Sequence, residues 1–75
     1  MTLDQLQQGK PAHIVSVGGD TALRRRLLDM GLTPGTVVEI DRFAPLGDPL
    51  ELCLRGYHLS LRLGAAEGIE IEVLP

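Results

Sequence analysis

The segment LELCLRGYHLSLRL, residues 50–63, constrains the fold most because its large apolar residues change phase halfway along it. They occupy even positions up to Leu54 and odd positions from Tyr57 onward. A two-residue turn at Arg55-Gly56 brings both sets onto one face of an antiparallel hairpin, since side chains alternate along a strand. The segment therefore predicts a buried hairpin face, with Tyr57 toward the core, that carries the cross-strand pairs Leu54–Tyr57, Leu52–Leu59 and Leu50–Leu61.

Upstream, residues 20–43 predict a helix that stops abruptly and turns into a strand. Asp20 suits the N-cap of a helix over residues 21–30, because its carboxylate can accept hydrogen bonds from the first turn. Gly31 stands where a residue of positive φ ends a helix, and Leu32 should then fold back onto Leu27. Pro34-Gly35 suits the centre of a type II turn that leads into a strand over residues 36–43.

The remaining segments complete a mainly β domain. We expect a helical turn in residues 2–6, strands over residues 12–17 and 69–74, a Pro- and Gly-rich loop APLGDP, and a connector AAEG. Five short strands with one apolar face each, and one α-helix after the first strand, favour a small, partly open, SH3-like barrel that leaves little free edge. Residues 1–75 are expected to form this single domain.

The amino-acid composition narrows the possible classes of function and partner. The net charge of −3 and the scarcity of stacking aromatics argue against a nucleic-acid partner. Cys53 is the only cysteine, which excludes an internal disulfide and suits the cytoplasm. We find no signal-peptide pattern and no apolar run near the roughly 20 residues of a membrane span, so membrane insertion is not expected. No catalytic constellation is evident, and an enzyme is not predicted.

One pair of residues could bind metal. The hairpin register places Cys53 directly across from His58 on the outer face, within reach of one soft metal ion. His13 is the only other histidine, and the four ligands of a structural zinc site are missing. We therefore expect ordinary outer-face residues and no required cofactor, with adventitious or weak transition-metal binding as the alternative.

Two surface features leave both a structural and an interface interpretation open. Arg24, Arg25 and Arg26 form the only basic cluster, which is either a solvated helix face or a docking patch for an acidic partner. Leu46 stands between two prolines in the APLGDP loop, where it is either an incidental exposed leucine or a preorganised contact.

Three segments carry a family likeness. RLLDMGLTPG (residues 26–35), APLGDPLEL (residues 44–52) and RGYHLSLR (residues 55–62) closely resemble the ferrous iron transport protein A family, FeoA. The resemblance covers nearly the whole chain and implies a small bacterial cytosolic protein with an SH3-like barrel. It also implies work alongside the ferrous iron permease FeoB of the inner membrane, which has a cytosolic GTP-binding domain.

The resemblance thus implies an accessory protein, peripheral to the inner membrane, that binds the cytosolic part of the permease and supports or regulates Fe²⁺ uptake. The alternative is a metal-responsive module like the SH3-like domain of iron-dependent repressors. A monomer or weak homodimer is expected. From motif position and expected exposure, the candidate partner contacts are Arg24, Arg25, Arg26, Asp29, Leu32, Leu46 and Asp48.

Overall fold

The computed structural model describes all residues, 1–75. The elements in chain order are a 3₁₀ turn η1 (Leu3–Gln5), β1 (Ala12–Val17), α1 (Thr21–Asp29), β2 (Val37–Phe43), β3 (Leu50–Leu54), β4 (Tyr57–Leu61), α2 (Leu63–Ala66) and β5 (Ile69–Val73). Five strands and one main helix after β1 confirm the predicted architecture. The helical turn predicted for residues 2–6 is confirmed as η1. The predicted connector AAEG overlaps α2, which begins two residues earlier than that connector.

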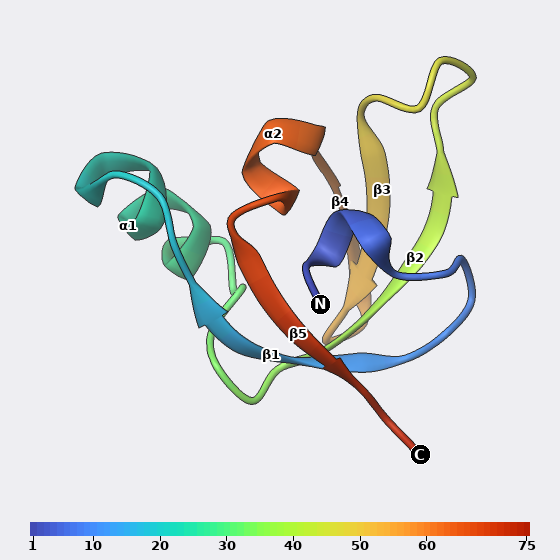
Figure 1. Cartoon of the computed structure of the whole chain (residues 1–75), viewed down its shortest axis with the longest axis horizontal. Helices are drawn as coiled ribbons and strands as arrows, with labels where there is room; N and C mark the ends of the chain where they lie inside the picture. Colours follow the sequence, from blue (N-terminus) through green and yellow to red (C-terminus); the bar gives the residue numbers. More distant parts are fainter.

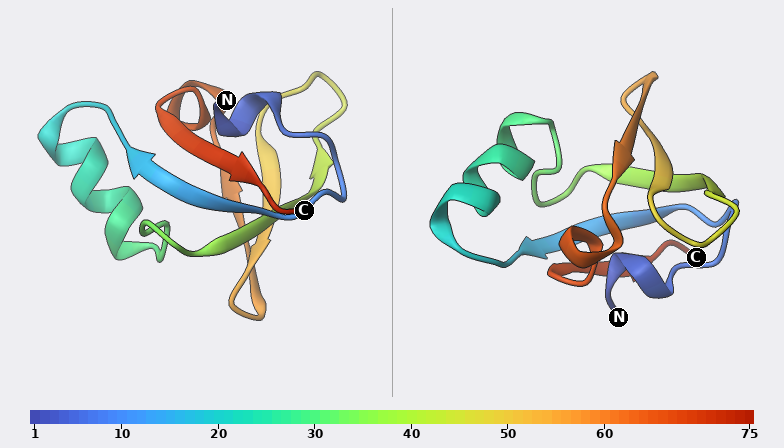
Figure 2. Two further views of the ribbon diagram at one scale, coloured as in Figure 1. Left: turned by 60° about the horizontal axis from the view of Figure 1, so that its bottom comes forward. Right: turned by 90° about the horizontal axis from the view of Figure 1, so that it is seen from above.

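The five strands form one curled antiparallel sheet in the order β4-β3-β2-β1-β5 (Figure 1). β1 pairs with β5 along its length and with β2 only near its start, so the sheet bends sharply where β1 meets β2. β4 and β5 are the sheet edges and do not pair, which leaves the barrel partly open. Two further views show α1 standing beside the barrel, while η1 and α2 lie together across one end (Figure 2).

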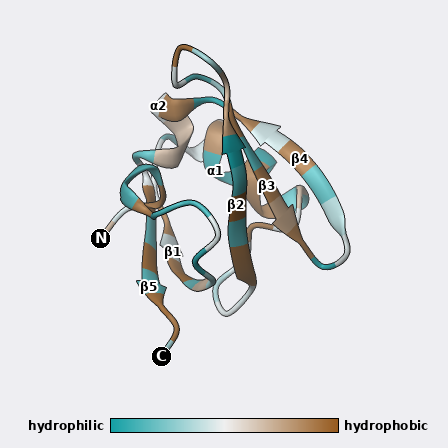
Figure 3. Ribbon diagram, turned by 90° about the vertical axis from the view of Figure 1, so that its right-hand side faces the viewer, coloured by the Kyte–Doolittle hydropathy of each residue, from teal (hydrophilic) through white to brown (hydrophobic).

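The core fills the inside of this curl. Sixteen buried apolar residues from every element form one cluster. On β3 the three leucines are buried, while Glu51 and Cys53 between them are half-buried; Figure 3 colours most of this strand as hydrophobic. No buried side-chain polar atom lacks a hydrogen-bond partner, so the apolar filling carries no uncompensated polar group.

The predicted hairpin register is confirmed in all three apolar pairs and in the pair Cys53–His58. The predicted burial of Tyr57 is wrong. The residue is 41% exposed, because the hairpin tip extends past the core (Figure 2) and the phenolic oxygen lies beside Gly31 at the end of α1. There the Tyr57 hydroxyl donates a hydrogen bond to the Met30 carbonyl. The strand β4 also ends earlier than its apolar pattern indicates, since Leu63 begins α2.

The end of α1 is built as the sequence predicts. Asp20 caps the helix, with its carboxylate accepting from Leu23 N–H at 2.9 Å. Gly31 has φ of +98°, and Leu32 N–H bonds the Leu27 carbonyl at 3.1 Å, closing the turn back onto the helix. A Cβ at Gly31 would overlap the phenolic oxygen of Tyr57, so a side chain here would displace the Tyr57 hydroxyl from the Met30 carbonyl as well as strain the backbone.

The turn that follows is held by a residue from the distant hairpin. Thr36 N–H bonds the Thr33 carbonyl at 3.0 Å, and Gly35 has φ of +90°, as the type II turn requires. Arg55 donates to the hydroxyls of Thr36 and Thr33 at 3.0 and 3.3 Å. Arg55 itself has φ of +49°, an uncommon conformation for a residue with a side chain. The hairpin tip is thereby tied to the segment after α1.

Gly31→Ala is expected to destabilise the protein by about 2–4 kcal/mol, because it adds backbone strain and a clash with Tyr57. Gly35→Ala is the matched control: it has a similar φ but open space, and should cost only about 1 kcal/mol. Urea denaturation monitored by circular dichroism measures both. Equal losses in the two variants would show that the Tyr57 approach contributes nothing.

Candidate functional site

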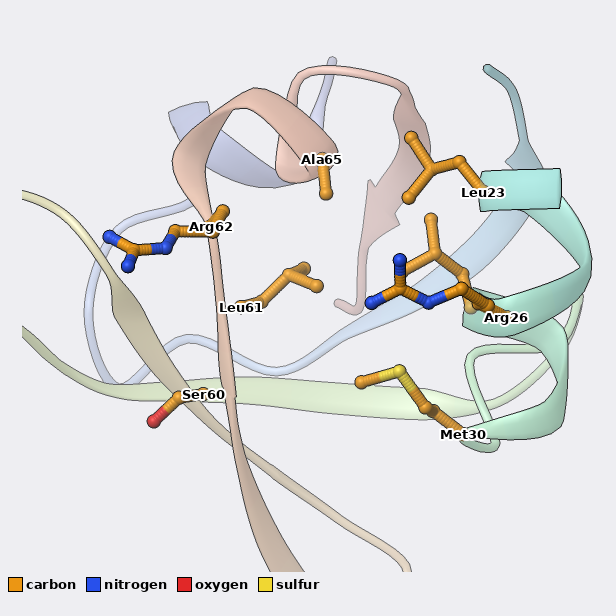
Figure 4. A pocket seen from close by; sticks show the side chains of 8 residues that line it. Leu23, Arg26, Met30, Ser60, Leu61, Arg62 and Ala65 are labelled. Atoms are coloured by element: carbon orange, nitrogen blue, oxygen red, sulfur yellow. The ribbon is translucent and has the colours of Figure 1, made fainter. Parts of the chain in front are cut away.

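A groove of about 330 Å³ runs between α1 and the segment where β4 continues into α2. Its eight lining residues are Leu23, Arg26, Leu27, Met30, Ser60, Leu61, Arg62 and Ala65. In Figure 4, Leu23 and Met30 reach from α1 toward the opposite wall, and the Arg26 guanidinium extends over the space between them. The groove therefore has an apolar floor with one arginine on each side, at Arg26 and Arg62.

The arginines around this groove are free of carboxylate partners. The chain has three ion pairs, and none of them includes Arg24, Arg25, Arg26 or Arg62. Four of the seven cationic residues thus lie unpaired on α1 and at the start of α2, in a chain of net charge −3. Arg24 differs from the others, because its Nε donates to the Val17 carbonyl at 3.1 Å and ties α1 to β1.

The prediction that Leu32 lies at the surface and contacts a partner is wrong. Its exposed fraction is 0%, because the glycine stop at the end of α1 folds it into the core. Asp29 is exposed in the last turn of α1, where a negative charge is unfavourable to the helix dipole, and it forms no ion pair. The structure gives Asp29 no stabilising role, so it remains available to a partner.

The loop between β2 and β3 holds Leu46 far from the core. Gly47 N–H bonds the Ala44 carbonyl at 2.7 Å, which closes a tight turn with Pro45 and Leu46 at its centre. The side chain of Leu46 is 97% exposed. A leucine at a turn centre contributes no burial to the fold, so its position favours the interface interpretation.

Asp48 connects this loop to the groove. Its carboxylate accepts a hydrogen bond from Leu63 N–H at 3.0 Å, at the first residue of α2. Arg62, which lines the groove, directly precedes Leu63. The loop is therefore tied to the start of α2, next to a lining residue of the groove. We call the groove lining together with Leu46 and Asp48 the groove face.

The predicted metal-ligand pair lies on a different face. Cys53 and His58 stand opposite each other on the outer side of the hairpin, and Asp41 of β2 joins them. His13 lies on β1, across from Val37 and Glu72, and does not belong to this cluster.

Sequence reasoning missed Arg62, the apolar groove floor and Asp41. The floor residues Leu23, Met30 and Leu61 follow the same apolar pattern as core residues. Only the position of α1 in the folded chain shows that they line a groove. Asp41 was missed because a bulge, which leaves no mark in the apolar pattern, moves it from its expected place opposite Glu51.

Comparison with known proteins identifies the family of this chain and solved structures with the same fold. The FeoA domain family model matches residues 1–73. The chain belongs to the FeoA domain family. A FeoA protein from Chlorobium tepidum, solved in solution, is 44% identical, with a TM-score of 0.93 over 100% of this chain and 71% of its own. The FeoA of Stenotrophomonas maltophilia, solved with zinc and described as a prokaryotic SH3 domain protein, is 28% identical, with a TM-score of 0.83 over 96% of this chain and 89% of its own.

A curated relative joins a FeoA-like segment to a transporter. The Fe(2+) transport protein A/Fe(2+) transporter FeoB fusion protein of Porphyromonas gingivalis is 38% identical over 74 residues. The match covers 99% of this FeoA-family chain but spans only 9% of the length of the fusion protein. None of the helices in the present structure has the length and apolar character needed to cross a membrane.

The fold also occurs in metal-dependent repressors. A manganese-dependent transcriptional repressor aligns with a TM-score of 0.90 over 99% of this chain and 36% of its own, at 14% identity. Identity this low shows a shared fold alone. The predicted SH3-like barrel is thus confirmed, both by the strand order and by its relatives.

Asp48→Ala is expected to destabilise the protein by about 0.5–2 kcal/mol, since the first N–H of α2 loses its acceptor. Leu46→Ala, two residues away, should change stability by less than about 0.5 kcal/mol because its side chain is solvated. Thermal unfolding followed by circular dichroism compares the two. A larger loss from Leu46→Ala would mean that Leu46 packs against the fold.

Proposed function

We propose that this protein is a cytosolic accessory protein of bacterial ferrous iron uptake, which binds the cytosolic part of a FeoB-type permease and supports or regulates Fe²⁺ transport. The observation that carries the proposal is the fusion relative, in which a segment 38% identical to this chain and a FeoB transporter are one polypeptide. Covalent joining keeps two modules at high effective concentration, which is useful to modules that act together.

The groove face suits this partner contact. Its apolar floor can receive one or two apolar side chains, and Arg26 and Arg62 can each pair with a carboxylate at the rim. Arginine beside an apolar pocket is typical of the residues that contribute most to protein interfaces. We therefore expect the permease to present an acidic segment with apolar anchors.

Leu46 extends the same contact. Because Asp48 fastens its loop to the start of α2, Leu46 is held at a fixed place relative to the groove. A preordered side chain loses little conformational entropy on binding. The two apolar elements, groove and loop tip, would then receive neighbouring parts of one partner surface.

The double variant Arg26→Glu/Arg62→Glu is expected to weaken binding to the full-length permease in nanodiscs by at least about tenfold, because charge attraction becomes repulsion. Isothermal titration calorimetry at two salt concentrations measures the affinity. The matched control is Lys10→Glu/Arg42→Glu, which changes the net charge equally but lies outside the groove. Control binding should stay within about threefold of wild type, the scale of a screened surface charge.

Equal weakening in both double variants would contradict a localised contact and indicate only general charge attraction. Full binding by Arg26→Glu/Arg62→Glu would remove the groove from the interface. If neither the wild-type chain nor its variants bind the permease, the proposed partner is wrong.

A further inference from the structure

The outer face of β2, β3 and β4 gathers three different metal-ligand types. Asp41, Cys53 and His58 come from the three neighbouring strands, and their possible ligand atoms all lie within 4.8 Å of one another. Asp41 Oδ2 and His58 Nδ1 are 2.5 Å apart, so these two side chains meet across the intervening strand that carries Cys53. No other group of three or more His, Cys, Asp or Glu residues in the chain is this compact.

A β-bulge creates this arrangement. In an uninterrupted ladder that continues from the Glu39–Cys53 pair, Asp41 would stand opposite Glu51. The register shifts between Ile40 and Arg42, so Arg42 takes that place and its Nε lies 2.8 Å from Glu51 Oε2. Asp41 becomes the extra residue of the bulge, free of a ladder partner, and its carboxylate turns toward His58.

Stabilisation of the fold does not account for the Asp41–His58 pair. The two side chains are 33% and 68% exposed, and exposed pairs of this kind contribute only about 0–1 kcal/mol. Cys53 is a free thiol, half-buried beside them. The three side chains thus converge at the surface although their contacts add little to the stability of the fold. An ion from solution can reach them there.

The donor set is chemically selective. Thiolate, imidazole and carboxylate together suit Zn²⁺ and Fe²⁺ rather than the all-oxygen sites of Mg²⁺ or Ca²⁺. Ligand atoms bound tetrahedrally at the usual zinc distances lie about 3.3–3.7 Å apart. The cluster reaches that spacing through shifts of about 1 Å in exposed side chains, with one coordination position left for water or another ligand.

We propose that Asp41, Cys53 and His58 bind one divalent transition-metal ion of the Zn²⁺ and Fe²⁺ class. Glu39 stands next to Cys53 in the same cross-strand row and adds negative charge to the neighbourhood. The site lies on the outer side of the hairpin, apart from the groove face. It therefore does not rest on the proposed partner, and each can fail without the other.

Co²⁺ is the probe, added to the full-length reduced protein in metal-free buffer. Wild type is expected to bind one Co²⁺ per chain, with the near-ultraviolet charge-transfer absorption of a cobalt–thiolate bond. Cys53→Ser should abolish that absorption. His58→Ala and Asp41→Asn should each weaken binding by more than tenfold, because losing even an outer partner of a metal ligand costs about 10–100-fold. His13→Ala is the matched control and should bind like wild type, since His13 lies outside the cluster.

A second measurement uses the wild-type chain alone, so it does not depend on whether a variant folds. Zn²⁺ should slow alkylation of Cys53 by iodoacetamide at least tenfold, and a chelator should restore the rate. The proposal is overturned if Zn²⁺ leaves the alkylation rate unchanged, if Co²⁺ binds equally to Cys53→Ser, or if His13→Ala loses binding. One Co²⁺ per two chains would also overturn it, because the ligands would then come from two molecules.

Discussion

The contact between the end of α1 and the tip of the β3–β4 hairpin determines how the rest of the surface is arranged. Along the chain, α1 is joined to the barrel through β1 and the turn before β2 (Figure 1), and Leu27 in the core and the Arg24–Val17 hydrogen bond hold it against the barrel. Tyr57 closes over Gly31 to reach the Met30 carbonyl, and Arg55 binds the turn that follows. These contacts fix one wall of the groove relative to the other, and the groove has its shape because of them.

The two sides of the β3–β4 hairpin contribute to two different parts of the protein surface and core. Its inward side supplies the buried leucines, and Leu61 continues from them into the groove floor. Its outward side carries Cys53 and His58, brought together by the same register that buries the leucines. The proposed partner contact and the proposed metal site therefore share a scaffold but use no common residue. Metal binding and partner binding can be measured separately for this reason.

Local chemistry in the sequence was sufficient to predict the register of the β3–β4 hairpin, the helix cap at Asp20 and the stop at Gly31, because each depends on neighbouring residues. Burial was harder to predict. The parity of Tyr57 is right, yet the core ends before it. Leu32 was predicted both to fold back onto Leu27 and to contact a partner, and its complete burial agrees only with the first. Asp41 and Arg62 depend on a bulge and on the placement of α2 against the loop of Asp48, and neither follows from a periodic pattern.

The most direct test of the account is an NMR titration of the isotopically labelled protein with the soluble GTP-binding domain of its cognate permease, in both nucleotide states. We expect shifts concentrated on the groove face, at Leu23, Met30 and Leu61 together with Leu46, with β5 and η1 unaffected. Shifts centred instead on β5 and η1, or none in either nucleotide state, would contradict the claim that this groove receives that domain.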